Sequence, residues 1–222
     1  MKMLSITTSS SVCSASLLDK TNIIKEITLN NAKTHSENLM PIISQLLVET
    51  STTLDDIECI ACDIGPGSFT GIRIGISTIK AIAEAKKIKI IPVTSLEALS
   101  YNVTTNTEYI CSLIDARNNN VYCGLFDNNH KLVGNYVADH IDNIIKLLPA
   151  STITFVGDGS ILHKTTLEQH LNDTAFFSDS NLLSATNLGI CAYNKSTFVS
   201  PDELVPLYLR KSQAERMLDL NG

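Results

Sequence analysis

The order of short apolar runs and amphipathic stretches constrains the fold most, because the same order occurs twice along the chain. Each half begins with three runs of strand length, continues with a helical pattern, and adds one more strand and one more helix. Matching positions in the two halves lie about 105 residues apart, which is typical of a structural duplication. The first half supplies expected strands at 4–8, 12–18, 23–29, 57–64 and 88–93, and helices from 34, at 71–87 and from 95.

The second half repeats this order closely. Its expected strands are 109–115, 121–126, 131–137 and 153–156, with a hairpin turn at 116–120, and its expected helices are 139–148 and a segment ending near 171. Strands rich in Ile and Val that alternate with helices predict an α/β protein of two similar lobes, 1–104 and 105–222, each with the order βββαβα. Such a duplication resembles the actin-like, ribonuclease H-like superfamily, which includes sugar kinases.

Composition and charge exclude several classes of function. The chain has 222 residues, 44% of them apolar, which is enough for a core without disulfide or metal staples. It lacks Trp, and its net charge of −6 gives it no general attraction to nucleic acid or to an anionic membrane. We therefore do not expect the chain to bind nucleic acid directly.

The cysteines and the N-terminus indicate a cytoplasmic protein. The six cysteines are scattered among apolar residues, as reduced buried thiols are. Cys59 and Cys62 form a CxxC pattern within an expected strand, where residues three apart point to opposite faces, so we interpret them as structural. The first residues turn polar too early for a signal peptide, and no apolar run is long enough for a membrane span.

The sharpest local signal is a glycine-rich segment between an expected strand and an expected helix, where backbone amides can hold an anion. Its candidate nucleotide or anion-binding residues are Gly65, Gly67, Ser68, Thr70 and Arg73. The segment is not a P-loop, because no Lys-Ser/Thr pair follows the glycines, and its glycine spacing does not fit a dinucleotide fingerprint. A purely structural turn remains the alternative interpretation.

The helix expected at 71–87 carries more apolar and small residues than one packing face requires. Gly71 and Gly75, four residues apart, would allow another helix to approach its backbone closely. The excess admits two interpretations: additional core within the lobe, or a surface for a second protein.

The sequence contains few side chains that could act in catalysis. His35, beside Ser36 and Glu37, and Asp115, at the end of an expected strand, are candidates for a vestigial site. The position that matches Asp115 in the first lobe carries Thr7 and Thr8 instead of an acid, and no histidines have metal-ligand spacing. We predict no catalytic residue and no metal site in this chain.

Four segments, in order along the chain, carry a specific resemblance to the TsaB family, formerly YeaZ. They are His35-Ser36-Glu37, Gly65-Pro66-Gly67-Ser68-Phe69-Thr70-Gly71-Ile72-Arg73-Ile74-Gly75, Pro92-Val93-Thr94-Ser95-Leu96-Glu97-Ala98-Leu99 and Ile114-Asp115-Ala116-Arg117. Pro206-Leu207-Tyr208-Leu209-Arg210 resembles the C-terminal signature of the same family. The chain departs from the family pattern at Thr7, where the first strand usually ends in Asp.

The resemblance implies an actin-like fold and a non-catalytic subunit of the bacterial complex that makes threonylcarbamoyladenosine beside the anticodon of tRNA. In that family the subunit activates the transferase TsaD through the first two helices of the first lobe, and the ATPase TsaE joins them. It also implies a competing homodimer, contact with tRNA only through the complex, and ATP or ADP only at the assembled complex. The expected interface residues are Leu39, Ile42, Ile43, Leu46, Ile72, Gly75, Ile76 and Ile79. An autonomous ATPase or a peptidase is the alternative.

Overall fold

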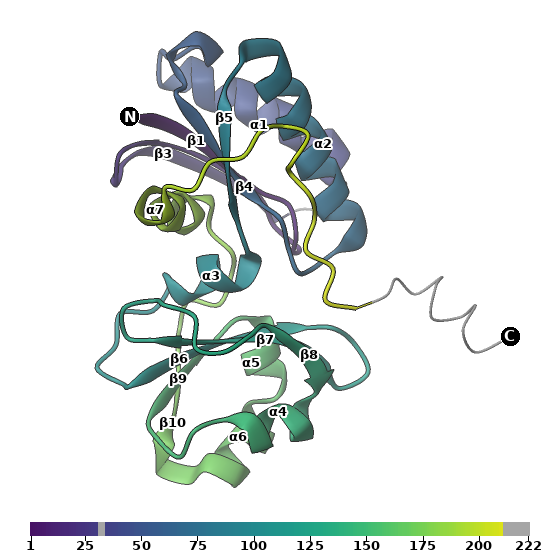
Figure 1. Cartoon of the computed structure of the whole chain (residues 1–222), viewed down its shortest axis with the longest axis vertical. Helices are drawn as coiled ribbons and strands as arrows, with labels where there is room; N and C mark the ends of the chain where they lie inside the picture. Colours follow the sequence, from purple (N-terminus) through teal and green to yellow (C-terminus); the bar gives the residue numbers. More distant parts are fainter. Residues whose placement is uncertain (31–33, 211–222) are drawn as a thin grey trace, which may run out of the picture.

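Two five-stranded sheets form the framework of the chain, stacked one above the other in Figure 1. The computed structural model describes residues 1–30 and 34–210. The first sheet has the order β3-β2-β1-β4-β5, with β1 antiparallel to β2 and parallel to β4. Its strands are β1 (Lys2–Thr7), β2 (Cys13–Asp19), β3 (Asn22–Leu29), β4 (Cys59–Asp63) and β5 (Lys89–Val93).

The second sheet repeats the first, with the order β8-β7-β6-β9-β10. Again the first strand of the lobe, β6, is antiparallel to the second and parallel to the fourth. Because the two orders correspond strand by strand, the predicted duplication is confirmed. The strands are β6 (Tyr109–Asp115), β7 (Asn120–Asp127), β8 (Val137–His140), β9 (Ile153–Val156) and β10 (Ala175–Phe177).

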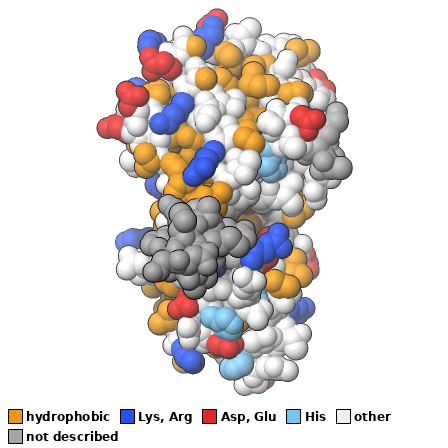
Figure 2. Space-filling view, turned by 90° about the vertical axis from the view of Figure 1, so that its right-hand side faces the viewer, with side chains coloured by type: hydrophobic (Ala, Val, Ile, Leu, Met, Phe, Trp, Pro, Cys, Tyr) orange, Lys and Arg blue, Asp and Glu red, His pale blue; other side chains and the backbone are white. Residues whose placement is uncertain are grey.

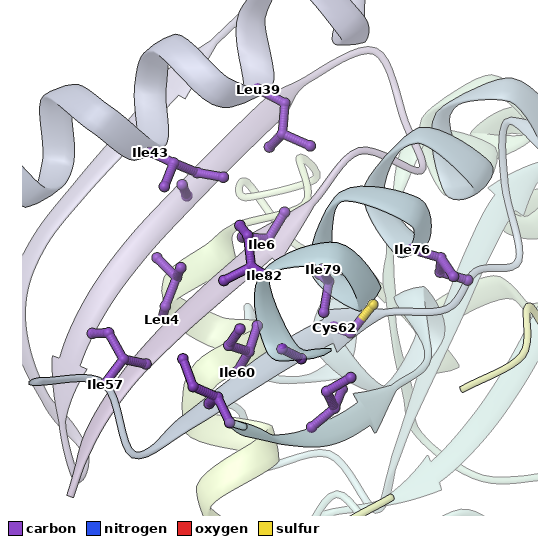
Figure 3. Close-up of a cluster of buried hydrophobic side chains, with 14 of the residues drawn as sticks. Leu4, Ile6, Leu39, Ile43, Ile57, Ile60, Cys62, Ile76, Ile79 and Ile82 are labelled. Carbon is purple, nitrogen blue, oxygen red and sulfur yellow. The ribbon is translucent and has the colours of Figure 1, made fainter. Parts of the chain in front are cut away.

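Helices α1 (His35–Glu49) and α2 (Phe69–Lys86) cover one face of the first sheet (Figure 1). A capping box between Thr34 and Glu37 starts α1, and Pro41 lies inside the helix on its exposed side. Apolar side chains from both helices meet Leu4, Ile6 and Ile60 of the sheet in one buried cluster (Figure 3). The resulting core is close-packed from Leu39 on α1 to Ile82 on α2.

The opposite face of the first sheet packs on α3 (Ser95–Ser100) and α7 (Ala185–Lys195), which join a cluster that extends into the second lobe. The predicted second lobe, 105–222, includes α7, but this helix packs on the first sheet. Although α7 follows the second sheet in sequence, it contacts β1 and β2 of the first, and Val199 pairs with Ile90 at the edge of β5. The chain from α7 to Leu207 therefore returns to the first lobe.

The second half of the chain differs from the sequence prediction in several elements, of which β10 and α7 have no predicted counterpart. The strand expected at 131–137 is displaced to β8, because Asp127 accepts the backbone N–H groups of Asn129 and Lys131 and folds that segment into a turn. After α4 (Ile141–Leu147), the single helix expected up to 171 is divided into α5 (Asp158–Leu162) and α6 (Lys164–Leu171). The described residues also include the 3-10 turns η1 (Leu54–Asp56) and η2 (Asn172–Thr174).

The surface of the first lobe carries apolar side chains on the face that Figure 2 turns to the viewer, where Lys and Arg side chains lie among them. All six cysteines are free and buried. Within the described part of the chain, none of the helices combines the length and the apolar character that a membrane crossing requires.

Candidate functional site: a cleft between the lobes

A cleft of about 470 Å³ opens where the two lobes meet. Four segments line it: the turn between β1 and β2, the glycine-rich segment with the start of α2, the turn between β6 and β7 with the adjoining strand ends, and the start of α5 after β9. The lining residues are Ser9, Ser10, Ser11, Gly67, Ser68, Phe69, Ile114, Asp115, Ala116, Arg117, Tyr122 and Asp158. The two turns occupy matching places in the duplicated lobes.

The glycine spacing of the predicted anion loop is explained by the β1–β2 turn that packs against it. A Cβ atom on Gly67 would lie 2.2 Å from the carbonyl oxygen of Ser9, and one on Gly71 would lie 1.9 Å from the carbonyl oxygen of Thr8. A Cβ on Gly75 would lie 2.4 Å from Oγ1 of Thr8. Three glycines spaced by four residues therefore let this turn reach the backbone of α2 and its preceding loop.

The remaining residues of the predicted anion loop have separate places. Gly65, at φ +92°, lies buried beneath the side chain of Ile72. The Ser68 hydroxyl accepts the backbone N–H of Gly71 at 3.2 Å, so it serves as the N-cap of α2. Thr70 and Arg73 are exposed outside the cleft lining. Of the five predicted residues, the structure brings Gly67 and Ser68 into the cleft.

We call the lining residues from the first lobe the first wall of the cleft; they are Ser9, Ser10, Ser11, Gly67, Ser68 and Phe69. Asp63, at the end of β4, binds the segments that form this wall. Its carboxylate accepts hydrogen bonds from the hydroxyls of Thr7 and Ser9 at 2.5 Å, from Ser95 at 2.7 Å and from the N–H of Gly65 at 2.9 Å. Burial raises the pKa of Asp63, and these donors partly offset the effect. The first strand usually ends in Asp in the family pattern. Here Thr7 stands at that position and donates a hydrogen bond to the buried carboxylate of Asp63.

The second wall of the cleft consists of the lining residues from the second lobe and carries two carboxylates, Asp115 and Asp158. Oδ1 of Asp158 accepts the N–H of Asp115 at 3.0 Å, and Oδ1 of Asp115 accepts the N–H of Arg117 at 2.8 Å. Burial raises the pKa of Asp158. Both side chains therefore also support the β6–β7 turn while facing the cleft.

His35 lies behind the first wall and outside the cleft lining. Its Nε2 lies 2.9 Å from the carbonyl oxygen of Ser10, so the ring joins the start of α1 to the β1–β2 turn. The two candidate vestigial residues, His35 and Asp115, thus approach the cleft from different lobes and do not share it. Among residues 1–30 and 34–210, no group of three or more His, Cys, Asp or Glu is placed to hold one metal ion.

The side chains chosen from sequence as a partner interface form the core of the first lobe. Leu39, Ile42, Ile43, Leu46, Ile72, Ile76 and Ile79 are each at most 6% exposed, and Figure 3 shows several of them directed towards the sheet. Gly75, the eighth, faces Thr8. The choice of side chains is therefore corrected: any contact made by α1 and α2 in this folded lobe has to use their outward faces.

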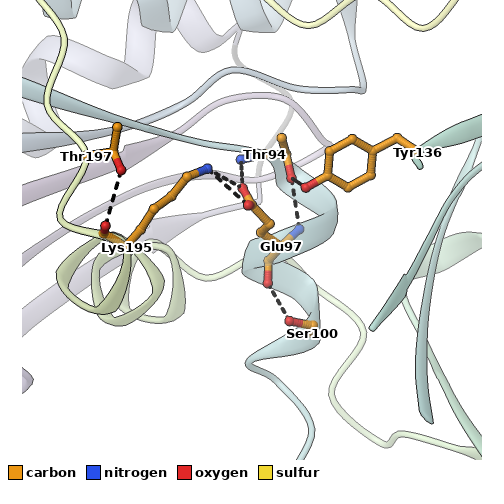
Figure 4. A network of polar contacts seen from close by, with 6 residues as sticks. All are labelled: Thr94, Glu97, Ser100, Tyr136, Lys195 and Thr197. Atoms are coloured by element: carbon orange, nitrogen blue, oxygen red, sulfur yellow. Dashed lines mark hydrogen bonds and ion pairs between the residues drawn. The ribbon is translucent and has the colours of Figure 1, made fainter. Parts of the chain in front are cut away.

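Figure 4 shows a polar network that joins the lobes around Glu97 of α3. Its carboxylate accepts the N–H of Thr94 at 2.8 Å and lies 3.0 Å from Nζ of Lys195, at the end of α7. The Thr94 hydroxyl in turn donates to the Tyr136 hydroxyl of the second lobe at 3.2 Å. Sequence reasoning named Glu97 only within a family motif, because nothing in the sequence indicates that Tyr136 and Lys195 lie beside it.

Sequence reasoning also missed Ser9, Ser11 and Asp158 as cleft residues. The signal available for the serines was their place after the first strand, which the duplication equates with the turn after β6. Asp158 follows β9 just as the glycine-rich segment follows β4, so the same correspondence would have located it.

Comparison with known proteins identifies the family. A family model described as "TsaD: tRNA N6-adenosine threonylcarbamoyltransferase" matches residues 22–217. The tRNA threonylcarbamoyladenosine biosynthesis protein TsaB of Bacillus subtilis is 30% identical over 221 residues, which cover 97% of this chain and 96% of that protein. The chain belongs to the TsaB (YeaZ) family.

Solved structures confirm the fold of this TsaB family member. YeaZ from Pseudomonas aeruginosa superposes with a TM-score of 0.80 at 24% identity, covering 94% of this chain and 99% of that one. The ROK hexokinase from Thermus thermophilus superposes with a TM-score of 0.53 at 10% identity over 88% of this chain and 99% of that one. The predicted actin-like fold is therefore confirmed.

Proposed function

We propose that this chain is a non-catalytic, activating subunit of the complex that makes threonylcarbamoyladenosine in tRNA, and that it acts by binding the transferase TsaD. The observation that carries this proposal is its likeness, along 97% of its length, to a protein named for threonylcarbamoyladenosine biosynthesis. We place the chain in the cytoplasm and expect tRNA to reach it only through the complex.

The first wall of the cleft supports a non-catalytic role. In this wall the acidic group at the strand ends is Asp63, which is 3% exposed and already accepts four hydrogen bonds from within the lobe. A carboxylate that already accepts these hydrogen bonds is poorly placed to activate a substrate in the cleft. ATP or ADP would accordingly be held at the assembled complex, with TsaE as the ATPase.

The outward faces of α1 and α2 are the surface we propose for TsaD. Met40 and Val48, eight residues apart on α1, are 52% and 74% exposed. On α2 the exposed Ser77, Ala81 and Ala85 follow each other at intervals of four, which leaves a line of small side chains against which a partner helix can lie closely. The same surface would allow a homodimer to form and to compete with the heterodimer.

A reconstituted reaction tests the function. Cognate TsaD, TsaE, threonylcarbamoyl-adenylate and tRNA are incubated with and without this chain, and the digested tRNA is analysed by nucleoside mass spectrometry. We expect threonylcarbamoyladenosine only when the chain is present. An equal yield without the chain would contradict the proposal.

The proposed surface is tested in the same reaction with Ala81→Arg, since this side chain is exposed and the change leaves the core untouched. We expect the variant to lose co-elution with TsaD and to lower the yield at least tenfold, because a desolvated, unpaired charge in a close helix contact costs several kcal/mol. Ala150→Arg, at an exposed position of the second lobe, is the matched control and should behave as wild type. Wild-type co-elution of Ala81→Arg would exclude this surface.

A further inference from the structure

The C-terminal strap, residues 204–210, runs from the first lobe to the second. Leu204 is buried in the core beneath α2, at 1% exposure. The N–H of Leu207 donates to the carbonyl oxygen of Ile64 at 2.8 Å, just before the glycine-rich segment. The strap is therefore fixed to the first lobe by burial and by a backbone hydrogen bond.

The next residue of the strap, Tyr208, contacts the first wall of the cleft. Its ring stacks on Phe69, with centroids 4.7 Å apart and planes 13° from parallel. Nε of Arg73 donates to its hydroxyl at 2.9 Å, and the guanidinium carbon lies 5.7 Å from the ring centroid. Since Phe69 lines the cleft, this contact ties the strap to the cleft wall itself.

Two residues later the strap reaches the second wall. Nη1 of Arg210 donates to the carbonyl oxygen of Ala116 at 3.1 Å. Ala116 opens a turn in which Arg117, Asn118 and Asn119 all have left-handed backbones, at φ +66°, +53° and +58°. Side chains rarely adopt this conformation in succession, so the turn benefits from support outside its own hydrogen bonds.

We propose that residues 207–210 form a latch that sets the opening of the interlobe cleft. Phe69 and Ala116 line the cleft from different lobes, and Tyr208 and Arg210 hold them from positions two apart in the chain. An extended chain covers at most about 3.5 Å per residue, so this short tether fixes how far the two walls can separate. Loss of either contact removes this tether between the walls. This inference concerns the chain alone and does not depend on the proposed function.

Hydrogen–deuterium exchange followed by mass spectrometry tests the latch in the full chain. In Arg210→Ala we expect exchange to rise about fivefold in the turn 115–121 and in the strap 204–209, the effect of losing about one hydrogen bond. The reporting amides are those of Ala116 and Asn120 in the turn and that of Leu207 in the strap. Strand β1 should exchange as in wild type.

Arg117→Ala is the matched control, since its guanidinium is 88% exposed and lies 3.7 Å from Asp115 of the same turn. It removes the same charge without touching the strap, so the exchange of 204–209 should not change. Tyr208→Ala removes the stacking contact with Phe69 at the other end of the latch. It should raise the exchange of the same two segments as Arg210→Ala. The latch is refuted if neither variant changes the turn, or if both raise exchange throughout the molecule, because a latch acts locally.

Discussion

Asp63 shows how a single buried carboxylate can determine the geometry of a loop. It accepts hydrogen bonds from three regions of the chain: the end of β1 with the following turn, the glycine-rich segment, and α3. Each donor is required because a buried carboxylate without partners is costly. The presence of Thr at position 7 follows from this network, since an acid there would place two carboxylates within hydrogen-bond distance.

Thr7→Val should therefore destabilise the fold. The change keeps the shape of the side chain and removes one of the two hydroxyls that donate to Oδ2 of Asp63. We expect the free energy of unfolding, measured in urea, to fall by about 2 kcal/mol. Thr104→Val, at an exposed position, is the control and should change it by less than about 0.5 kcal/mol. Equal stability of both variants would show that the Thr7 hydroxyl is not needed by Asp63.

Single residues were predictable from sequence where a local rule decides. The expectation that Cys59 and Cys62 diverge is confirmed, because the first packs in the cluster that reaches the second lobe and the second in the cluster beneath α2. Strand alternation alone decides this outcome. The role of Asp63 was not predictable in the same way, because it depends on three hydroxyls brought together by the sheet.

At the scale of elements, the excess of apolar residues on α2 was observed correctly, and its cause is now clear. This helix packs on the sheet, on α1 and on the β1–β2 turn, so its buried side is wider than one stripe. Hydrophobic periodicity gives the width of the apolar side but does not distinguish core from interface. That is why the predicted interface residues proved to be buried.

The close approach of Thr8 to α2 leads to a prediction with an unusual sign. Gly→Ala stabilises an exposed helix by about 1 kcal/mol, yet here it should destabilise the lobe. We expect a loss of about 3 kcal/mol or more for Gly71→Ala, where backbone is in the way, and about 1–2 kcal/mol for Gly75→Ala, where the Thr8 side chain can move. Ser77→Ala, exposed on the same helix, should raise stability slightly. Urea unfolding measures all three, and a stabilised Gly71→Ala would contradict the close packing.

For the whole molecule, the two-lobe duplication was predictable, because repeated element order survives when sequences diverge. The position of α7 was not predictable. The helix itself was not predicted, and its contacts with β1 and β2 are what place it on the first sheet. The same limit applies to the cleft, whose walls come from both lobes.

Two histidines should lower the stability of the whole molecule in mild acid, whereas the raised pKa values of Asp63 and Asp158 act in the opposite direction. Burial lowers the pKa of His163 and that of His130 in the folded chain. In the unfolded chain histidine takes up a proton near pH 6.5, so below that value the unfolded state binds more protons and gains free energy. We expect a smaller free energy of unfolding at pH 5.5 than at pH 7.5, measured in urea.

His163→Leu should reduce this dependence on pH, because its Nε2 is buried without a hydrogen-bond partner. His170→Leu, at an exposed position of α6, is the matched control. If both variants keep the wild-type difference between the two pH values, His163 is not a source of the effect.

The return of α7 to the first sheet also has a consequence for biosynthesis. The ribosome releases the first five strands long before residues 185–210 exist to cover their second face, whereas the second sheet is complete once Phe177 has emerged. In sequence the second lobe is thus an insertion within the first. We expect the lobe that is synthesised later to mature earlier, and the N-terminal lobe to wait for the last part of the chain.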